Sequence, residues 1–150
     1  MKKFTKTIFT VFLATTLILS LAACGKTETP NSDAANTEAE LWKNATYNTD
    51  TELGQGSKNL LVVVKAYDQS VLFTIHTDET TVGGALLENN LITGDDSAYG
   101  LYVKSVNGIV ADYDADQSYW AFYIDDDYAV SGVDQTEIAE ESVYKLEYTK

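Results

Sequence analysis

Alternating hydrophobic positions predict most of the strands in this chain. Residues 59–67 form a nearly continuous run of apolar and β-branched side chains, NLLVVVKAY. After a short polar turn, residues 71–77 alternate in polarity, with Val71, Phe73 and Ile75 on one face. Two such runs joined by a short turn are typical of a β-hairpin.

The hydrophobic period changes to that of a helix over residues 80–92. Thr80 or Thr81 can cap this helix, because a threonine hydroxyl accepts a hydrogen bond from a free N–H group of the first turn. Gly83 and Gly84 each cost about 1 kcal/mol relative to alanine, so the helix is expected to depend on packing against a sheet. Its apolar stripe consists of Val82, Ala85 and Leu86.

The next part of the chain predicts a loop and a second hairpin. Residues 93–100 are rich in Gly, Asp and Ser, which predicts a loop. Residues 101–106 and the segment after Asn107 and Gly108 are predicted to be paired strands, because Asn and Gly adopt the positive φ angles of a tight turn. Residues 143–149 alternate again and predict a last strand.

The most aromatic segment, residues 118–134, has the sequence SYWAFYIDDDYAVSGVD. Successive side chains of a strand point to opposite faces of the sheet. One face of this strand is therefore a core candidate, and the other carries tyrosines around a small residue. The first face consists of Trp120, Phe122 and Ile124, and the second consists of Tyr119, Ala121 and Tyr123.

The order of these elements predicts an α+β domain with a single helix packed on a mixed sheet. Residues 41–150 are long enough for one such domain. Residues 24–40 contain no aromatic or β-branched aliphatic side chain and include the one proline of the chain. A segment of this composition cannot bury a core, so it is predicted to be a flexible tether.

The amino terminus has the layout of a secretory signal. Residues 1–23 begin with lysines and continue with an apolar run that is too short to span a bilayer as a stable helix. The run ends in LAAC, Leu21 to Cys24, which resembles a bacterial lipobox. We therefore expect cleavage before Cys24 and attachment of lipid to its sulfur. The lipid would anchor the protein to the extracytoplasmic face of the cell membrane.

The net charge of the chain limits the kinds of molecule that it can bind. The chain has 23 acidic and 10 basic residues, a net charge of −13, and contains no arginine. Removal of residues 1–23 takes away three lysines and no acidic residue, which makes the remainder more acidic still. Such a surface repels nucleic acid and anionic headgroups and keeps the protein soluble near a membrane.

Little in the sequence supports catalysis, a cofactor or a metal. His76 is the one histidine and Cys24 the one cysteine, so no catalytic triad or zinc site can be assembled and we expect no enzyme activity. The spacing DYDAD at 112–116 resembles the first ligands of a calcium loop. However, Gln117 replaces the glycine needed at the sixth position and Tyr123 the glutamate needed at the twelfth. A weak surface calcium site is the most that this pattern supports.

The aromatic side chains are the best candidates for a binding site. Two interpretations stay open: the large aromatics fill a small core, or they contact a planar ligand, a sugar or a protein partner. The candidate ligand-binding residues are Tyr99, Tyr102, Tyr119, Trp120 and Tyr123.

Four segments together carry a resemblance to a known family. They are WKNATYNTDTELGQGSKNL from residue 42, FTIHTDETTVGGALLENNLI from residue 73, the stretch YGLYVKSVNGIVADYDADQSYWAFYIDDDYAVSGVD at 99–134, and a terminal VYKLEY. Residues 42–150 thereby resemble the bacterial lipoproteins with a DUF4430 domain, which is similar to the C-terminal β-domain of transcobalamin and intrinsic factor. The resemblance implies a β-grasp-like fold and a domain that closes over one face of a corrinoid.

Two turns differ from the pattern of this family. Asp125 and Asp126 stand where the family commonly has Asn-Gly, and Glu140, Glu141 and Ser142 stand where it has a turn with glycine. Aspartate adopts left-handed backbone angles less readily than Asn or Gly, so we expect both turns to be longer here.

Three functions remain open at this point. The first is an anchored module that captures a small ligand, a corrinoid by the resemblance, and passes it to a membrane transporter. The second is a protein-interaction or adhesion module of the cell envelope. The third is a hydrolase whose carboxylates converge in a cleft.

Overall fold

The computed structural model describes residues 32–150, with side chains from residue 37 onward. The predicted signal peptide, Cys24 and the first part of the predicted tether lie outside these residues. Among the residues described, no helix combines the length and the apolar character needed to cross a membrane.

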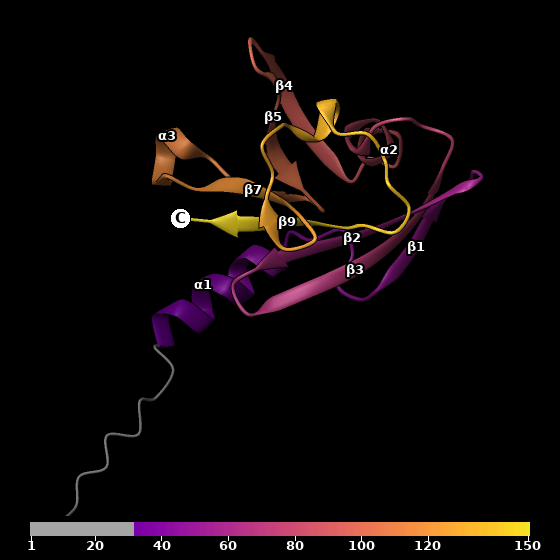
Figure 1. The fold of residues 1–150 in the computed structure, drawn as a ribbon. Coiled ribbons are helices and arrows are strands. Elements are labelled where there is room, and N and C mark those ends of the chain that lie inside the picture. The colour runs from indigo at the N-terminus through magenta and orange to yellow at the C-terminus, as the bar shows by residue number, and fades with distance from the viewer. Residues whose placement is uncertain (1–31) are drawn as a thin grey trace, which may run out of the picture.

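The main structural element is a mixed sheet of six strands in the order β1-β3-β2-β9-β7-β8 (Figure 1). The predicted hairpin is confirmed, with β2 and β3 antiparallel. Strand β9 runs parallel to β2 and antiparallel to β7, which makes the sheet mixed. The strands are β1 (Thr51–Gly54), β2 (Lys58–Ala66), β3 (Gln69–Thr77), β7 (Tyr119–Ile124), β8 (Asp127–Tyr128) and β9 (Val143–Thr149).

A second, smaller sheet has the order β4-β5-β6. Its strands are β4 (Ile92–Ser97), β5 (Gly100–Val106) and β6 (Ile109–Val110). The prediction of a loop over 93–100 was therefore wrong for most of its length. The side chains of β4 are mainly polar and exposed, but the strand is held by backbone pairing with β5, which side-chain periodicity does not reveal.

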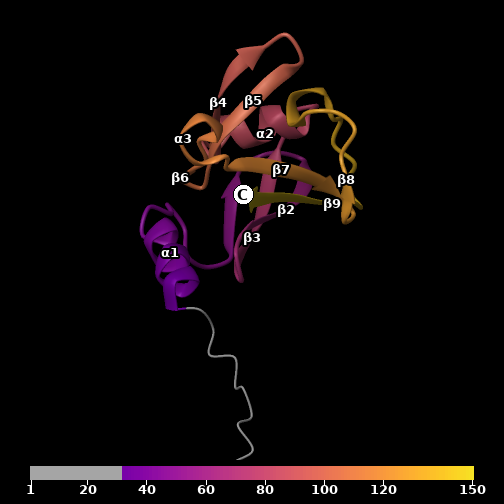
Figure 2. The same ribbon diagram turned by 90° about the vertical axis from the view of Figure 1, so that its left-hand side faces the viewer.

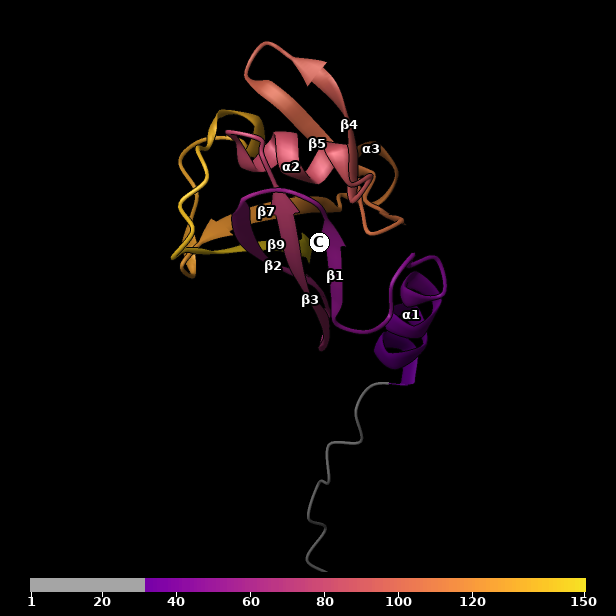
Figure 3. The same ribbon diagram turned by 90° about the vertical axis from the view of Figure 1, so that its right-hand side faces the viewer.

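Helix α2 (Val82–Glu88) lies on the buried face of the large sheet, on the same side as the small sheet (Figures 2 and 3). Thr81 caps it by accepting a hydrogen bond from Gly84 N at 3.1 Å. The helix ends before the predicted residue 92, because Asn90 has a φ of 54° and Leu91 N then donates to Leu86 O at 2.9 Å. The three predicted stripe residues of α2 are all buried.

The core lies between α2, the small sheet and the inner face of the large sheet. The alternation predicted for β3 is confirmed, because Val71, Phe73 and Ile75 are all buried. Strand β7 contributes Trp120 and Phe122 to the same core. The predicted α+β class, with a mixed sheet and a packed helix, is confirmed, and so is the predicted hairpin of β5 and β6. The separation of this hairpin, together with β4, into a second sheet and the short helix α3 (Tyr113–Asp116) were not predicted.

Helix α1 (Ser32–Trp42) overlaps the segment that was predicted to be a flexible tether. Residues 32–40 are helical in the structure, and side chains near the end of this segment bond to the sheet and to its β2–β3 turn. Trp42 is buried and its indole N–H donates to Ala66 O at 3.1 Å. Glu38 accepts hydrogen bonds from the backbone N–H groups of Asp68 and Gln69 in the β2–β3 turn.

The β7–β8 turn is short, contrary to the prediction of a longer one. Asp125 and Asp126 have φ angles of 51° and 69°, as a two-residue hairpin turn requires. The Asp125 carboxylate accepts hydrogen bonds from Ser142 Oγ at 2.9 Å and Val143 N at 2.8 Å. These two bonds join the turn to the start of β9 and stabilise a backbone conformation that aspartate does not favour. The turn before β9 is also tight, with Ser142 N donating to Ala139 O at 3.1 Å.

The two aspartates are expected to respond differently to glycine. Asp126→Gly relieves a positive φ at a side chain that is almost fully exposed, so its thermal midpoint should stay level or rise by about 1–4 °C. Asp125→Gly relieves a similar angle but removes two hydrogen bonds, so its midpoint should fall by about 3–8 °C. Thermal unfolding followed by circular dichroism tests this, and equal shifts would contradict it.

Candidate functional site

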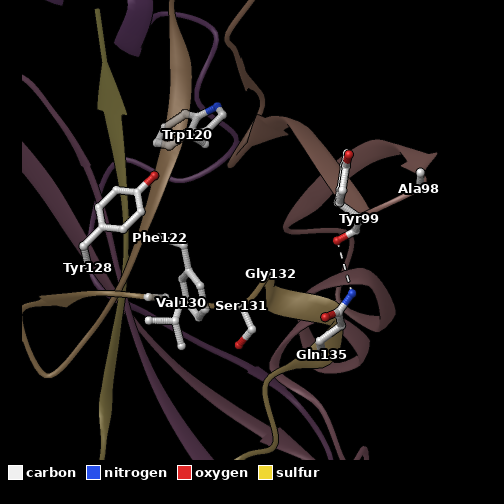
Figure 4. Close-up of a pocket in the computed structure, with 10 residues that line it drawn as sticks. Ala98, Tyr99, Trp120, Phe122, Tyr128, Val130, Ser131, Gly132 and Gln135 are labelled. Carbon is white, nitrogen blue, oxygen red and sulfur yellow. Dashed lines mark hydrogen bonds between the residues drawn. The ribbon is translucent and has the colours of Figure 1, made fainter.

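A cavity of about 570 Å³ opens at the edge of the large sheet, where β7 and β8 meet the turn between β4 and β5 (Figure 4). The segment that follows β8 forms the third side. The lining residues are Ala98, Tyr99, Trp120, Phe122, Tyr128, Ala129, Val130, Ser131, Gly132 and Gln135.

Two buried aromatic rings of β7 form the floor of the cavity. Trp120 is 7% exposed and packs edge-on against Tyr148, with ring centroids 5.7 Å apart. Phe122 stacks on Tyr144 at 6.2 Å. Because Tyr144 and Tyr148 belong to the neighbouring strand β9, both floor rings are held by the core of the sheet.

The rim carries large apolar side chains that are open to solvent. Tyr99 is 92% exposed, Tyr128 is 62% exposed and Val130 is fully exposed. These three side chains surround the same opening, although Tyr99 comes from the β4–β5 turn whereas Tyr128 and Val130 come from β8 and the segment that follows it (Figure 4). A contiguous exposed apolar patch beside a cavity commonly marks a binding site.

The wall of the cavity is fixed by its contact with helix α2. The short helix η1 (Val133–Gln135) lies against α2, and a Cβ atom at Gly83 would come within 2.8 Å of the Asp134 Cα. Thr136 Oγ1 donates to Gly132 O at 2.9 Å, and Gln135 Nε2 donates to Tyr99 O at 3.1 Å. The last bond joins the wall to the β4–β5 turn.

Two buried polar atoms next to the cavity have no hydrogen-bond partner among the described residues. They are the indole Nε1 of Trp120 and the Oδ1 atom of Asp134. A Cβ atom at Gly132 would lie 2.8 Å from Asp134 Oδ1, so this oxygen sits directly behind the cavity wall. Buried polar atoms without a hydrogen-bond partner are uncommon in native proteins, and a ligand or an ordered water often supplies the missing bond.

The structure brings two of the five predicted ligand-binding residues, Tyr99 and Trp120, into this cavity. Tyr102 lines a separate cavity of about 400 Å³ with Tyr113. Tyr119 lines a small space of about 130 Å³ between β5 and β7, where Trp120 and Tyr102 also contribute. Tyr123 lies on the other face of β7.

Tyr123 is held by neighbours on that opposite face. Its ring meets the ring of Tyr128 edge-on at 5.3 Å, and Lys145 Nζ lies 4.5 Å from its centroid. Lys145 also bonds the Asp126 carboxylate at 2.9 Å, which lowers the pKa of Asp126 and raises that of Lys145. Tyr123 therefore supports the β7–β8 hairpin and reaches the cavity only through Tyr128.

Eight of the ten lining residues were missed as site candidates, and those with large side chains are Phe122, Tyr128, Val130 and Gln135. Phe122 was predicted only as a core residue, and it is both buried and part of the cavity floor. Val130 lies in an irregular segment and Gln135 in the short helix η1, and the position of both depends on the contact at Gly83, so strand periodicity gives no signal for them.

The aspartates of the rejected calcium pattern have other partners. Asp112 caps helix α3 by accepting hydrogen bonds from Asp114 N and Ala115 N. The ammonium of Lys150 and the hydroxyl of Ser118 hold the pKa of Asp116 at about 2. Within residues 32–150, no three His, Cys, Asp or Glu side chains are grouped so that they could hold a metal ion. The histidine of this region, His76, contacts Glu52 at 2.5 Å and lies on β3, away from the cavity.

Comparison with protein families supports part of the predicted resemblance. Residues 79–150 match the model of the family described as "Domain of unknown function (DUF4430)". The matched range begins just before α2 and includes all ten residues that line the cavity. No curated protein matches the chain.

Two solved structures are similar to this chain. A protein from Ruminococcus gnavus, described as a "putative metal binding protein", is 27% identical with a TM-score of 0.59; the match covers 63% of this chain and 98% of that one. Haptocorrin in complex with Cbi is 13% identical with a TM-score of 0.49; the match covers 65% of this chain and 26% of that one. The predicted similarity to a DUF4430 domain is thus confirmed over residues 79–150.

Adjacent glycines of α2 are expected to differ in their tolerance of a side chain. Gly83→Ala places a methyl group against the backbone of η1 and should lower the free energy of unfolding by about 1–3 kcal/mol. Gly84→Ala meets mainly the carboxylate of exposed Glu79, which can rotate, so the change should be smaller than about 1 kcal/mol. Urea unfolding measures both, and equal losses would contradict the assigned contact.

Proposed function

We propose that this chain is a non-catalytic binding module that captures a small ligand in the aromatic cavity, outside the cell and close to the membrane. The observation that carries the proposal is the combination of a buried aromatic floor with an exposed apolar rim. Trp120 and Phe122 are held by the core, whereas Tyr99, Tyr128 and Val130 project into solvent around the same opening. A ligand that covers the rim would remove this apolar surface from water.

The shape of the site favours a broad and flat ligand. A cavity of about 570 Å³ is in the usual range for small-molecule sites. The exposed side chains of the rim extend the apolar surface beyond the cavity itself. Tyrosine rings offer rigid flat surfaces at low entropic cost. A corrinoid is the first candidate, because the sequence resembles a family with a β-domain that closes over one face of such a molecule.

The charges of the site favour a neutral or cationic ligand. None of the lining residues is charged, and the carboxylate of Asp134, beside Gly132, has an oxygen without a partner behind the wall. With a net charge of −13, the protein repels phosphates and nucleic acid.

Metal capture is not part of the proposal. The Ruminococcus gnavus protein is described as metal binding, but residues 32–150 of this chain lack a cluster of carboxylate, histidine or cysteine ligands. Catalysis is not included either, because no residue of the cavity is an ionisable acid, base or nucleophile apart from tyrosine and serine.

The proposed location follows from the sequence around Cys24. Lipid on this sulfur would hold the domain at the extracytoplasmic face of the membrane, where it could pass its ligand to a membrane transporter. Helix α1 would then stand between the lipidated end and the sheet, since it is anchored by Trp42.

Ligand capture is tested by titrating the purified full chain with cobinamide and with cobalamin, followed by absorbance and calorimetry. We expect micromolar binding. Tyr99→Ala should weaken it about five- to tenfold without changing the thermal midpoint, because this side chain contacts little of the protein. Tyr113→Ala is the matched control, since Tyr113 is also exposed but lies outside the cavity, and its affinity should be unchanged.

Absence of micromolar binding to both compounds would remove the corrinoid from the proposal. Equal weakening by Tyr99→Ala and Tyr113→Ala would move the site away from the cavity. Binding of a purified cell-envelope protein to the same residues, without any small ligand, would favour the alternative of an interaction or adhesion module, for which the exposed rim is also suited.

The membrane anchor is tested in the native host with labelled palmitate. The wild-type protein should incorporate the label and sediment with membranes, whereas Cys24→Ser should do neither, because lipid transfer needs the sulfur. Unlabelled wild-type protein with an uncleaved leader would contradict the proposed location.

A further inference from the structure

The outer edge of β7 is paired over only part of its length. Strand β8 pairs with Tyr123 and Ile124, and no other strand within residues 32–150 pairs with this edge. The part of β7 from Tyr119 to Phe122 is therefore paired with a strand, β9, on one side only, and β5 contacts β7 without pairing with it.

Two backbone hydrogen bonds determine which backbone groups point outward. Asp125 N donates to Val143 O at 2.9 Å, so the register makes Tyr123 and Ala121 the residues that bond to β9. On the other side, Ala129 N donates to Phe122 O at 2.9 Å. The alternation of an antiparallel strand then directs the N–H and C=O groups of Trp120, and the N–H group of Phe122, away from β9.

These outward groups face the aromatic cavity. After Ala129 the chain leaves the edge of β7, because Val133 and Asp134 are packed against α2 instead. The cavity lies in the space that results, with Trp120 and Phe122 on one side and residues 130–132 on the other (Figure 4). An open strand edge beside apolar pockets is the arrangement that binds extended peptides by strand addition.

We propose that this edge accepts an extended, basic peptide segment of a partner protein as an additional strand beside β7. The proposal uses the cavity of the proposed function but goes beyond that function, because the occupant is a peptide and its main chain supplies the recognition. Alternate side chains of the bound strand would rest on the aromatic floor, where Trp120 and Phe122 are two residues apart on the same face.

The charges around the edge favour a basic peptide. Asp127 is exposed where the chain enters β8, and the unpartnered oxygen of Asp134 lies behind the wall. The other two aspartates of the turn already have partners, since Asp125 bonds Ser142 and Val143 and Asp126 bonds Lys145. None of the lining residues is a lysine, so no cation within the described residues occupies this opening. A lysine-rich strand would complement the carboxylates of Asp127 and Asp134 and would be attracted over a distance by the net charge of −13.

The other free edge near the cavity is unsuited to the same role. The outer edge of β4 is lined by exposed Thr93, Asp95 and Asp96, a polar and acidic pattern that discourages strand addition. It also has no apolar floor beside it. The edge of β7 differs because apolar side chains adjoin its outward backbone groups.

The experiment uses the purified full chain and the capped peptide acetyl-KIKYKIK-amide as the probe, with binding followed by calorimetry and amide NMR. Two versions of the peptide carry N-methyl groups, one on the lysine amides and the other on the isoleucine and tyrosine amides. In a strand these two sets of N–H groups point to opposite edges. One version should therefore lose at least about tenfold in affinity while the other stays within about threefold of the parent.

The amide signals give an independent readout. On binding, the N–H groups of Trp120 and Phe122 should shift and exchange more slowly with solvent, while those of Ala121 and Tyr123 should change little. The acidic peptide acetyl-EIEYEIE-amide should bind at least about tenfold more weakly than the lysine peptide at low salt. Equal affinities for the two methylated peptides, whether both are retained or both lost, would overturn the proposal, and so would unchanged Trp120 and Phe122 signals.

Cobinamide titration of the same sample separates the two proposals. If the peptide binds and cobinamide does not, the corrinoid assignment fails and the strand site stands. If cobinamide binds and the peptide does not, the strand site fails and the ligand assignment stands. Where both bind, they should compete, because they share Trp120 and Tyr99.

Discussion

The close approach of helix α2 to the segment between β8 and β9 is the contact on which the candidate site depends. Gly83 has no side chain, and this lets the backbone of η1 lie directly on the helix. Main-chain hydrogen bonds from Val82 N to Thr136 O and from Ile138 N to Thr80 O hold the two segments together on either side. Since α2 is itself packed on the buried face of the large sheet, the wall of the cavity is positioned by the core and not by the loop's own conformation.

Strand β7 serves the fold and the site at once. Its inner side chains fill the core and form the cavity floor, and one set of its backbone groups completes the pairing with β9. The other set faces the cavity because the chain is drawn away from the strand towards α2. The same contact at Gly83 that fixes the wall therefore also leaves the strand edge open, so the wall and the edge cannot be treated as independent features.

Periodicity predicted the parts of the fold that side-chain burial determines, such as the β2–β3 hairpin and the face of Trp120 and Phe122. It failed where backbone or distant polar contacts decide. Strand β4 is polar and is held by pairing with β5, and α1 is held by a hydrogen bond from Trp42 to a residue 24 positions away. The tight turn at Asp125 depends on Ser142 and Val143, which are also remote in sequence. Tyr99 and Trp120 could be proposed as site residues because they are aromatic. Val130 and Gln135 could not, because contacts with residues remote in sequence bring them to the cavity.

The floor and the rim of the cavity differ in what they contribute to stability. Buried aromatic rings such as Trp120 stabilise the fold whether or not a ligand is present, so their position alone does not argue for function. The rim side chains Tyr99 and Val130 contact little of the protein, and their exposure to water contributes nothing to folding. Exposed apolar side chains also favour self-association, which the strongly negative charge of this chain opposes. The charge thus lets the protein keep an apolar rim in solution, and it selects against anionic molecules that would otherwise occupy the same opening.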